Sequence, residues 1–132
     1  MIVVSAGIVS RNGKIMLCQR RPGDRLALKW EFPGGKLEKG ETVAQALVRE
    51  LAEELNYQVN PLDVMYRLVV HPTPERELIL HFMRAYPVSG SIPESCENQQ
   101  FRWVSPAELD QVDFLSTDRE FVDFMKMAYK VK

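Results

Sequence analysis

Short apolar runs separated by turn-forming residues recur along most of the chain, and they predict a protein rich in β-structure. The dipeptide Asn12-Gly13, which lies between the first two runs, is a strong signal for a β-hairpin. The third run is short because Pro33 and Gly34 stop it. The predicted strands cover residues 2–9, 14–19, 30–32, 64–70, 77–86 and 101–104.

A different spacing of apolar residues marks one amphipathic helix, predicted from Val43 to about Leu55. Thr42 is suited to cap its first turn. Asn56 follows its last turn, where a helix often ends on a left-handed residue, and Asn tolerates that conformation better than most residues. The core-facing stripe consists of apolar residues four positions apart: Val43, Leu47, Leu51 and Leu55.

Two more helical segments are predicted near the end of the chain. Ser105 followed by Pro106 is a capping residue with proline at the first helical position, so a short helical turn should begin there. Apolar residues further on indicate a closing helix from about Asp118. The chain shows no repeat and no linker, so we expect residues 1–132 to form one mixed α+β domain.

Composition narrows the class of protein. The chain has 132 residues, of which 45% are hydrophobic and 27% are charged, and a formal net charge of -1. This balance argues against stable binding to a nucleic acid, which normally requires a basic surface. Cys18 and Cys96 do not form a disulfide framework or a zinc motif. The apolar opening, residues 1–10, has no basic leader and is too short for a membrane span, so a cytoplasmic protein is expected.

The predicted helix carries three carboxylates on one flank, at Glu50, Glu53 and Glu54. Their spacing places them on adjacent turns, where they repel one another and the negative end of the helix dipole. A solvated acidic face with an Arg49–Glu53 ion pair is one interpretation. The other is a divalent cation site, because Mg²⁺ and Mn²⁺ prefer hard oxygen ligands. Arg49 would then orient Glu50 or Glu53.

The second interpretation gains from a resemblance, because the segment is similar to the signature motif of the Nudix hydrolases, G-x5-E-x7-R-E-U-x-E-E-x-G-U, in which U is bulky and aliphatic. Asn56 replaces the usual Gly and Tyr57 the last aliphatic residue, and neither change removes a charged group. The order of segments, including E-F-P-G-G-K and F-R-W-V-S-P-A-E-L, resembles the MutT-type enzymes over nearly the whole chain. The residues in register are Gly35, Glu41, Arg49, Glu50, Leu51, Glu53 and Glu54.

The resemblance implies a Nudix fold, with a mixed β-sheet sandwiched between helices, and Mg²⁺-dependent hydrolysis of a nucleoside triphosphate to the monophosphate and pyrophosphate. Mn²⁺ is a possible substitute. By position, the implied metal ligands are the Gly34 carbonyl and the carboxylates of Glu50, Glu53, Glu54 and Glu97. The general base is left open between Glu50 and Glu97.

Residues outside the motif are expected to hold the substrate. Arg20 and Arg21 suit a polyphosphate, because guanidinium groups bind phosphate oxygens in pairs, and strand alternation should turn only one of them into the site. The resemblance favours Arg21. It also places residues 31–34, Glu31-Phe32-Pro33-Gly34, near the substrate, with Phe32 either against the base or in the core.

The choice of base depends on Asp118, which stands about where the enzymes that act on 8-oxo-dGTP carry an Asn. An ionised Asp only accepts hydrogen bonds and suits cytosine N4, whereas a protonated Asp can meet a modified purine. Asp118 can also simply cap the last helix. We therefore expect 8-oxo-dGTP or a similar nucleotide first and CTP or dCTP second.

A further alternative is a non-catalytic nucleotide sensor of the same fold. Such domains commonly lose glutamates of the motif, whereas this chain keeps them all. The protein is expected to act as a monomer or a homodimer.

Overall fold

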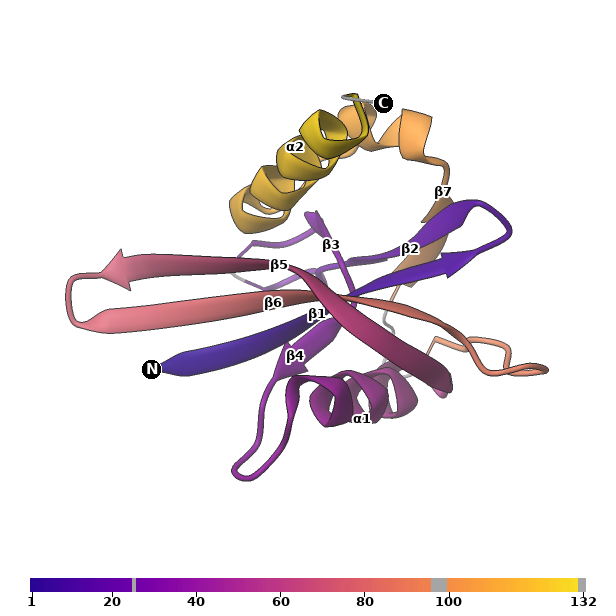
Figure 1. Cartoon of the computed structure of the whole chain (residues 1–132), viewed down its shortest axis with the longest axis horizontal. Helices are drawn as coiled ribbons and strands as arrows, with labels where there is room; N and C mark the ends of the chain where they lie inside the picture. The colour runs from indigo at the N-terminus through magenta and orange to yellow at the C-terminus, as the bar shows by residue number, and fades with distance from the viewer. Residues whose placement is uncertain (25, 96–99, 131–132) are drawn as a thin grey trace.

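A mixed β-sheet with helices on both faces forms the centre of the molecule (Figure 1). The computed structural model describes residues 1–24, 26–95 and 100–130. Its strands are β1 (Ile2–Arg11), β2 (Lys14–Gln19), β3 (Trp30–Glu31), β4 (Gly34–Lys36), β5 (Val59–Thr73), β6 (Arg76–Pro87) and β7 (Gln100–Val104). Its helices are α1 (Val43–Leu55), the 3-10 helix η1 (Pro106–Gln111) and α2 (Ser116–Lys130). Within the described residues, no helix combines the length and the apolar character needed to span a membrane.

Strand β1 organises the sheet because it has different partners along its length. It pairs in parallel with β6 from Ile2 to Val9, and on its other side it pairs antiparallel with β4 and then with β2. The main path through the sheet is β3-β2-β1-β6-β5, and β7 pairs with β2. One edge of β1 therefore pairs with two different strands, first β4 and then β2.

Alternation along β1 divides the core into two layers. Ala6 and Ile8 join the cluster beneath α2, whereas Val9 joins the cluster beneath α1. Phe121 of α2 stacks on Phe82 of β6 with ring centroids 4.5 Å apart. Leu47, Leu51 and Leu55 of α1 are fully buried on the opposite face. Figure 1 shows α1 and α2 on opposite sides of the sheet. The mixed α+β class expected from the pattern, and the sandwich that the resemblance implies, are both confirmed.

Helix α1 has the bounds that the sequence predicts. The Thr42 hydroxyl accepts a hydrogen bond from the backbone N–H of Gln45, and the Gln45 side chain accepts one from the N–H of Thr42. These two bonds form a capping box. Asn56 ends the helix in the left-handed conformation, with φ 46° and ψ 39°. Caps at both ends therefore fix the helix in position along its axis.

Other segments differ from the prediction. Residues 34–36, predicted as a loop, form strand β4. The strand was missed because its two glycines have no side chains and so give no alternating pattern. Strand β5 begins at Val59, five residues earlier than expected, and tolerates Pro61 where its pairing with β6 is irregular. Helix α2 begins at Ser116, so Asp118 lies inside its first turn and is not the residue before the helix.

The end of α1 gives the first prediction. Replacing Asn56 by Ala should lower the free energy of unfolding by about 1 kcal/mol relative to replacing it by Gly, because a Cβ is strained in the left-handed conformation. Both variants lose the hydrogen bond that the Asn56 amide donates to Glu94 (2.7 Å). The difference between their free energies of unfolding therefore measures the cost of the left-handed backbone conformation. Urea unfolding of the two proteins measures it, and equal stabilities would contradict the assignment.

Candidate active site

A cleft of about 420 Å³ lies between strand β4 and the first turn of α2. It brings together residues from β1, the loop after β2, β3 and β4, α1, β6 and the start of α2. The predicted site residues that line it are Arg20, Arg21, Glu31, Phe32, Gly34, Gly35, Glu54 and Asp118. Pro33 does not line it but is buried beside it, and its carbonyl accepts a hydrogen bond of 2.7 Å from the N–H of Gly7. Glu97 lies outside the residues that the structure describes.

The glycines of β4 allow the helix and the sheet to meet closely. A Cβ atom added to Gly35 would lie 2.5 Å and 2.8 Å from the two carboxylate oxygens of Glu50. Gly34 has φ 145° and its Cβ would collide with the Ser5 carbonyl of β1. Any side chain at either position would displace strand β4 or the Glu50 carboxylate. The two glycines are therefore required for Glu50 to reach the edge of the cleft.

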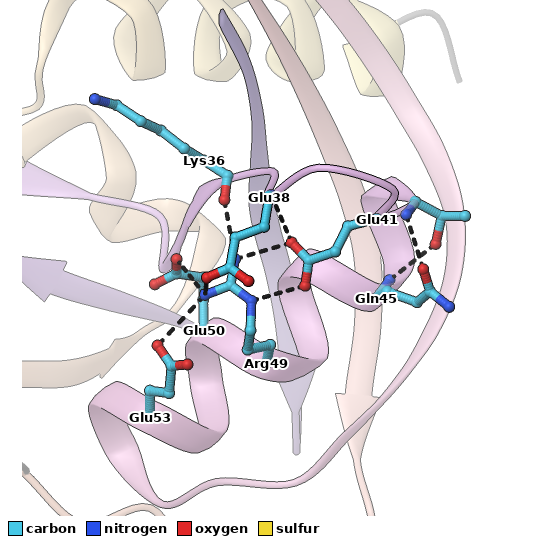
Figure 2. Close-up of polar contacts among 8 residues, drawn as sticks. Lys36, Glu38, Glu41, Gln45, Arg49, Glu50 and Glu53 are labelled. Carbon is cyan, nitrogen blue, oxygen red and sulfur yellow. Dashed lines mark hydrogen bonds and ion pairs between the residues drawn. The ribbon is translucent and has the colours of Figure 1, made fainter.

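Arg49 binds the acidic groups around it from one position on α1, as Figure 2 shows. Its guanidinium donates two hydrogen bonds to the carboxylate of Glu41, at 2.7 Å from Nε and 3.0 Å from Nη2. Nη1 donates to Glu50 Oε1 at 3.0 Å and contacts Glu53 Oε2 at 3.4 Å. Nη2 also donates to the Lys36 carbonyl at 3.0 Å, which ties α1 to β4.

Arg49 contacts both partners that the sequence predicts for it, Glu50 and Glu53. Its closest partner, Glu41, was not predicted. Glu41 is paired in a bidentate arrangement across the loop that precedes the helix, and the Glu38 N–H also donates to it at 2.8 Å. The hydrogen bonds from Arg49 hold the pKa of Glu41 below its ordinary value, and the bond from Glu38 adds to this effect. The only signal in the sequence was the place of Glu41 in the motif, because the pair is eight residues apart and has no helical periodicity.

Glu54 lies in the least favourable position of the three helix carboxylates. Burial, followed by hydrogen bonding with Glu50 and repulsion from it, raises the pKa of Glu54 to about 8. Arg21 opposes this shift only weakly. Two carboxyl groups that share a hydrogen bond at a buried edge of the cleft are stabilised either by a shared proton or by a cation.

The donor chemistry of this edge fits a divalent cation. Glu54 lines the cleft together with Gly34, and Glu50, which does not line it, is hydrogen-bonded to Glu54. The side chain of Glu53 is more than half exposed and contacts Arg49. Among the described residues, no three Asp, Glu, His or Cys side chains converge on one point. Glu53 would have to turn away from Arg49 to join Glu50 and Glu54.

Two arginines enter the cleft from the loop that follows β2. Strand alternation was expected to direct only one of them inward, but β2 ends at Gln19 and both line the cleft. Arg20 is half-buried and donates to Asp24 at 2.8 Å and to Glu31 at 3.4 Å. Arg21 is exposed at the mouth of the cleft. Asp24 was not predicted, although its position four residues after Arg20 would have allowed the pairing.

The cleft is also lined by a buried acidic group, Asp118. Asp118 is only 4% exposed. Burial, and then the nearby charge of Glu31, raise the pKa of Asp118 well above its ordinary value, although a hydrogen bond donated by the Phe32 backbone opposes the shift. Phe32 itself is both a core residue and part of the cleft wall, since its ring stacks on Phe114 at 5.5 Å.

Comparison with known proteins agrees with this geometry. The model of the NUDIX domain matches residues 1–125, and the chain therefore belongs to the Nudix family of hydrolases.

Two relatives from Escherichia coli (strain K12) share more than a third of their aligned residues with the chain. A CTP pyrophosphohydrolase is 38% identical over 121 residues, which cover 89% of this chain and 86% of the relative. An 8-oxo-dGTP diphosphatase is 35% identical over 112 residues, which cover 84% and 85%. The solution structure of the Escherichia coli ORF135 protein superposes with a TM-score of 0.80 at 34% identity, covering 97% of this chain and 91% of that one. The MutT-type resemblance and the α+β Nudix fold are thereby confirmed.

The contact between Glu41 and Arg49 predicts a pH-dependent stability. The folded state lowers the pKa of Glu41 below 4.5, so this carboxylate stabilises the fold above that pH and loses its effect as the pH falls through the folded pKa. Glu41→Gln should therefore be less stable than the parent protein at neutral pH, and the gap should close as the pH falls below 4.5. Thermal unfolding at several pH values measures the gap. Glu75→Gln, at an exposed turn, is the control, and a gap for Glu41→Gln that stays constant with pH would refute the argument.

Proposed function

We propose that the chain hydrolyses a (deoxy)nucleoside triphosphate to the monophosphate and pyrophosphate in the cytoplasm, as a housecleaning enzyme for the nucleotide pool. The observation that carries this proposal is the arrangement along one cleft of an acidic edge, a pair of arginines and a buried polar end. A nucleoside triphosphate can use all three, with its phosphates at the acidic edge and the arginines and its base at the buried polar group. The names of the relatives, a CTP pyrophosphohydrolase and an 8-oxo-dGTP diphosphatase, support the same reaction type.

Each part of the cleft has a proposed role. Arg21, which is exposed at the mouth, binds the phosphate oxygens, and Arg20 is oriented beside it by Asp24 and Glu31. Glu50, Glu53 and Glu54, with the Gly34 carbonyl, would hold Mg²⁺, or Mn²⁺ in its place, with Glu97 as a fifth proposed ligand. When bound, the ion would neutralise phosphate oxygens and favour ionisation of the attacking water. Glu50 or Glu97 accepts the proton of that water.

For the base, the setting of Asp118 supports 8-oxo-dGTP or a similar nucleotide as the first candidate. A neutral carboxyl group both donates and accepts a hydrogen bond, so it can pair with a carbonyl and an N–H on the edge of an oxidised purine. CTP or dCTP is the second candidate, because an ionised Asp118 would accept from cytosine N4. The CTP pyrophosphohydrolase relative, at 38% identity, keeps this alternative open.

The reaction itself is tested by measuring kcat/KM for a panel of canonical and oxidised nucleotides with Mg²⁺. We expect pyrophosphate release, with oxidised or cytosine nucleotides preferred. Tight binding of one nucleotide with no turnover in the whole panel would instead support the non-catalytic sensor. The same samples, analysed by sedimentation, decide between a monomer and a homodimer.

Substituting the helix carboxylates should abolish turnover without unfolding the protein. Glu53→Gln and Glu54→Gln are each expected to reduce kcat by roughly a hundredfold or more, because each removes a charged ligand while keeping the shape of the side chain. Glu120→Gln, on the exposed face of α2, is the matched control. Circular dichroism checks the fold. Near-normal kcat in both variants would refute the assignment of these residues.

Asp118→Asn tests the choice of base. An amide keeps one donor and one acceptor but cannot ionise, so kcat/KM for CTP should fall about tenfold or more while 8-oxo-dGTP is retained. If the neutral form reads the purine, activity of the parent protein on 8-oxo-dGTP should decline as the pH rises through the elevated pKa of Asp118, and the variant should lack this decline. Asp123→Asn, exposed on the same helix, is the control. An unchanged substrate ranking and pH profile would assign Asp118 a structural role only.

A further inference from the structure

A row of in-register residues crosses four neighbouring strands beneath helix α1. Ser5 of β1 is paired with Gly35 of β4 on one side and with His81 of β6 on the other, and His81 is paired with Arg67 of β5. Residues paired in register present their side chains on the same face of a sheet. That face is the one α1 covers, because the Cβ position of Gly35 points at Glu50.

Two polar atoms in this row are buried and have no hydrogen-bond partner in the described structure: Ser5 Oγ and His81 Nδ1. Ser5 is fully buried and also lines the cleft. It is a polar residue in an otherwise apolar stretch of β1, and neither packing nor the proposed substrate contacts explain it. Buried polar groups are normally satisfied, and an internal water is the usual partner when no protein group is in reach.

The Glu50 carboxylate lies above the strand next to Ser5. It covers Gly35, which is one strand away from Ser5, and strands are about 4.8 Å apart. Two hydrogen bonds of about 2.8 Å through one water span this distance. Burial, aided by the charge of Arg67, lowers the pKa of His81, so its imidazole is neutral and can accept at Nδ1. Arg49 already binds Oε1 of Glu50 at 3.0 Å, from the side of the preceding loop.

We propose that Ser5 and His81 hold one internal water that donates a hydrogen bond to the carboxylate of Glu50 and so fixes that carboxylate opposite Arg49. The water accepts from the Ser5 hydroxyl and donates to His81 Nδ1 and to Glu50, which satisfies all three groups. Ser5 and His81 are thus positioning residues that act through Glu50. The inference rests on the proposed function only in treating Glu50 as part of the catalytic edge.

The first test is Ser5→Ala, which removes the hydroxyl and leaves space. We expect kcat to fall about tenfold, the size of one hydrogen bond to a charged group, with KM for the nucleotide nearly unchanged. Calorimetric titration with Mn²⁺ alone should show affinity weakened severalfold, because Glu50 is less well oriented. His81→Asn, which can keep an acceptor near the Nδ1 position, should retain more activity than His81→Leu. Ser10→Ala, an exposed position on the same strand, is the matched control.

The second test is a high-resolution crystal structure of the parent protein. It should show a water within hydrogen-bond distance of Ser5 Oγ, His81 Nδ1 and a Glu50 oxygen. The proposal is overturned if that position is empty, or if Ser5→Ala leaves kcat and Mn²⁺ affinity unchanged. A reduction of KM and kcat by the same factor would also oppose it. Should the parent protein hydrolyse no nucleotide, the proposed function fails, whereas the crystal structure and the Mn²⁺ titration still decide this inference.

Discussion

The site depends on the way in which Arg49 neutralises and orients the carboxylates around it. Helix α1 carries Glu50, Glu53 and Glu54 on one flank, where mutual repulsion would drive their side chains apart. The bidentate pair with Glu41 fixes the orientation of the Arg49 guanidinium. The same guanidinium donates from Nη1 to Glu50 Oε1 at 3.0 Å and so holds the Glu50 carboxylate. A lysine could not replace it, because one ammonium lacks the planar fork that serves several acceptors in set directions. The loop that precedes the helix, through Glu41, therefore determines how Arg49 orients the carboxylates of α1.

The second constraint is the close approach of backbone at β4. Gly34 and Gly35 let this strand pair with β1 while Glu50 occupies the space that a side chain would fill. Because β1 pairs with β4 along its first half and with β2 along its second, the sheet opens between these strands. Glu54, the loop arginines and the start of α2 all line the cleft beside β4. One glycine-rich strand thus connects helix α1 to the cleft.

Helix α1 and its caps could be predicted from local sequence, because the spacing of apolar residues, the capping residue Thr42 and the terminal Asn56 all indicate the same helix. Local sequence did not predict β4, where glycines carry no alternating pattern, or the start of β5, where Pro61 argued against a strand. Motif spacing identified the helix glutamates, but contacts across the sheet had no local signature. The pairing of Glu41 with Arg49 and the burial of Ser5 in register with His81 follow only from tertiary structure. Asp118 was predicted as a candidate for base recognition, but its burial, which favours the neutral form, was not.

The central claim is that this cleft directs attack on the phosphoanhydride bond that joins the nucleoside monophosphate to the terminal two phosphates. Phosphorus NMR of the products formed from a preferred nucleoside triphosphate with Mg²⁺ tests it most directly. The account predicts equal amounts of nucleoside monophosphate and pyrophosphate, and no product after the metal is removed with a chelator. Formation of nucleoside diphosphate and orthophosphate, or product formation that persists without metal, would contradict it.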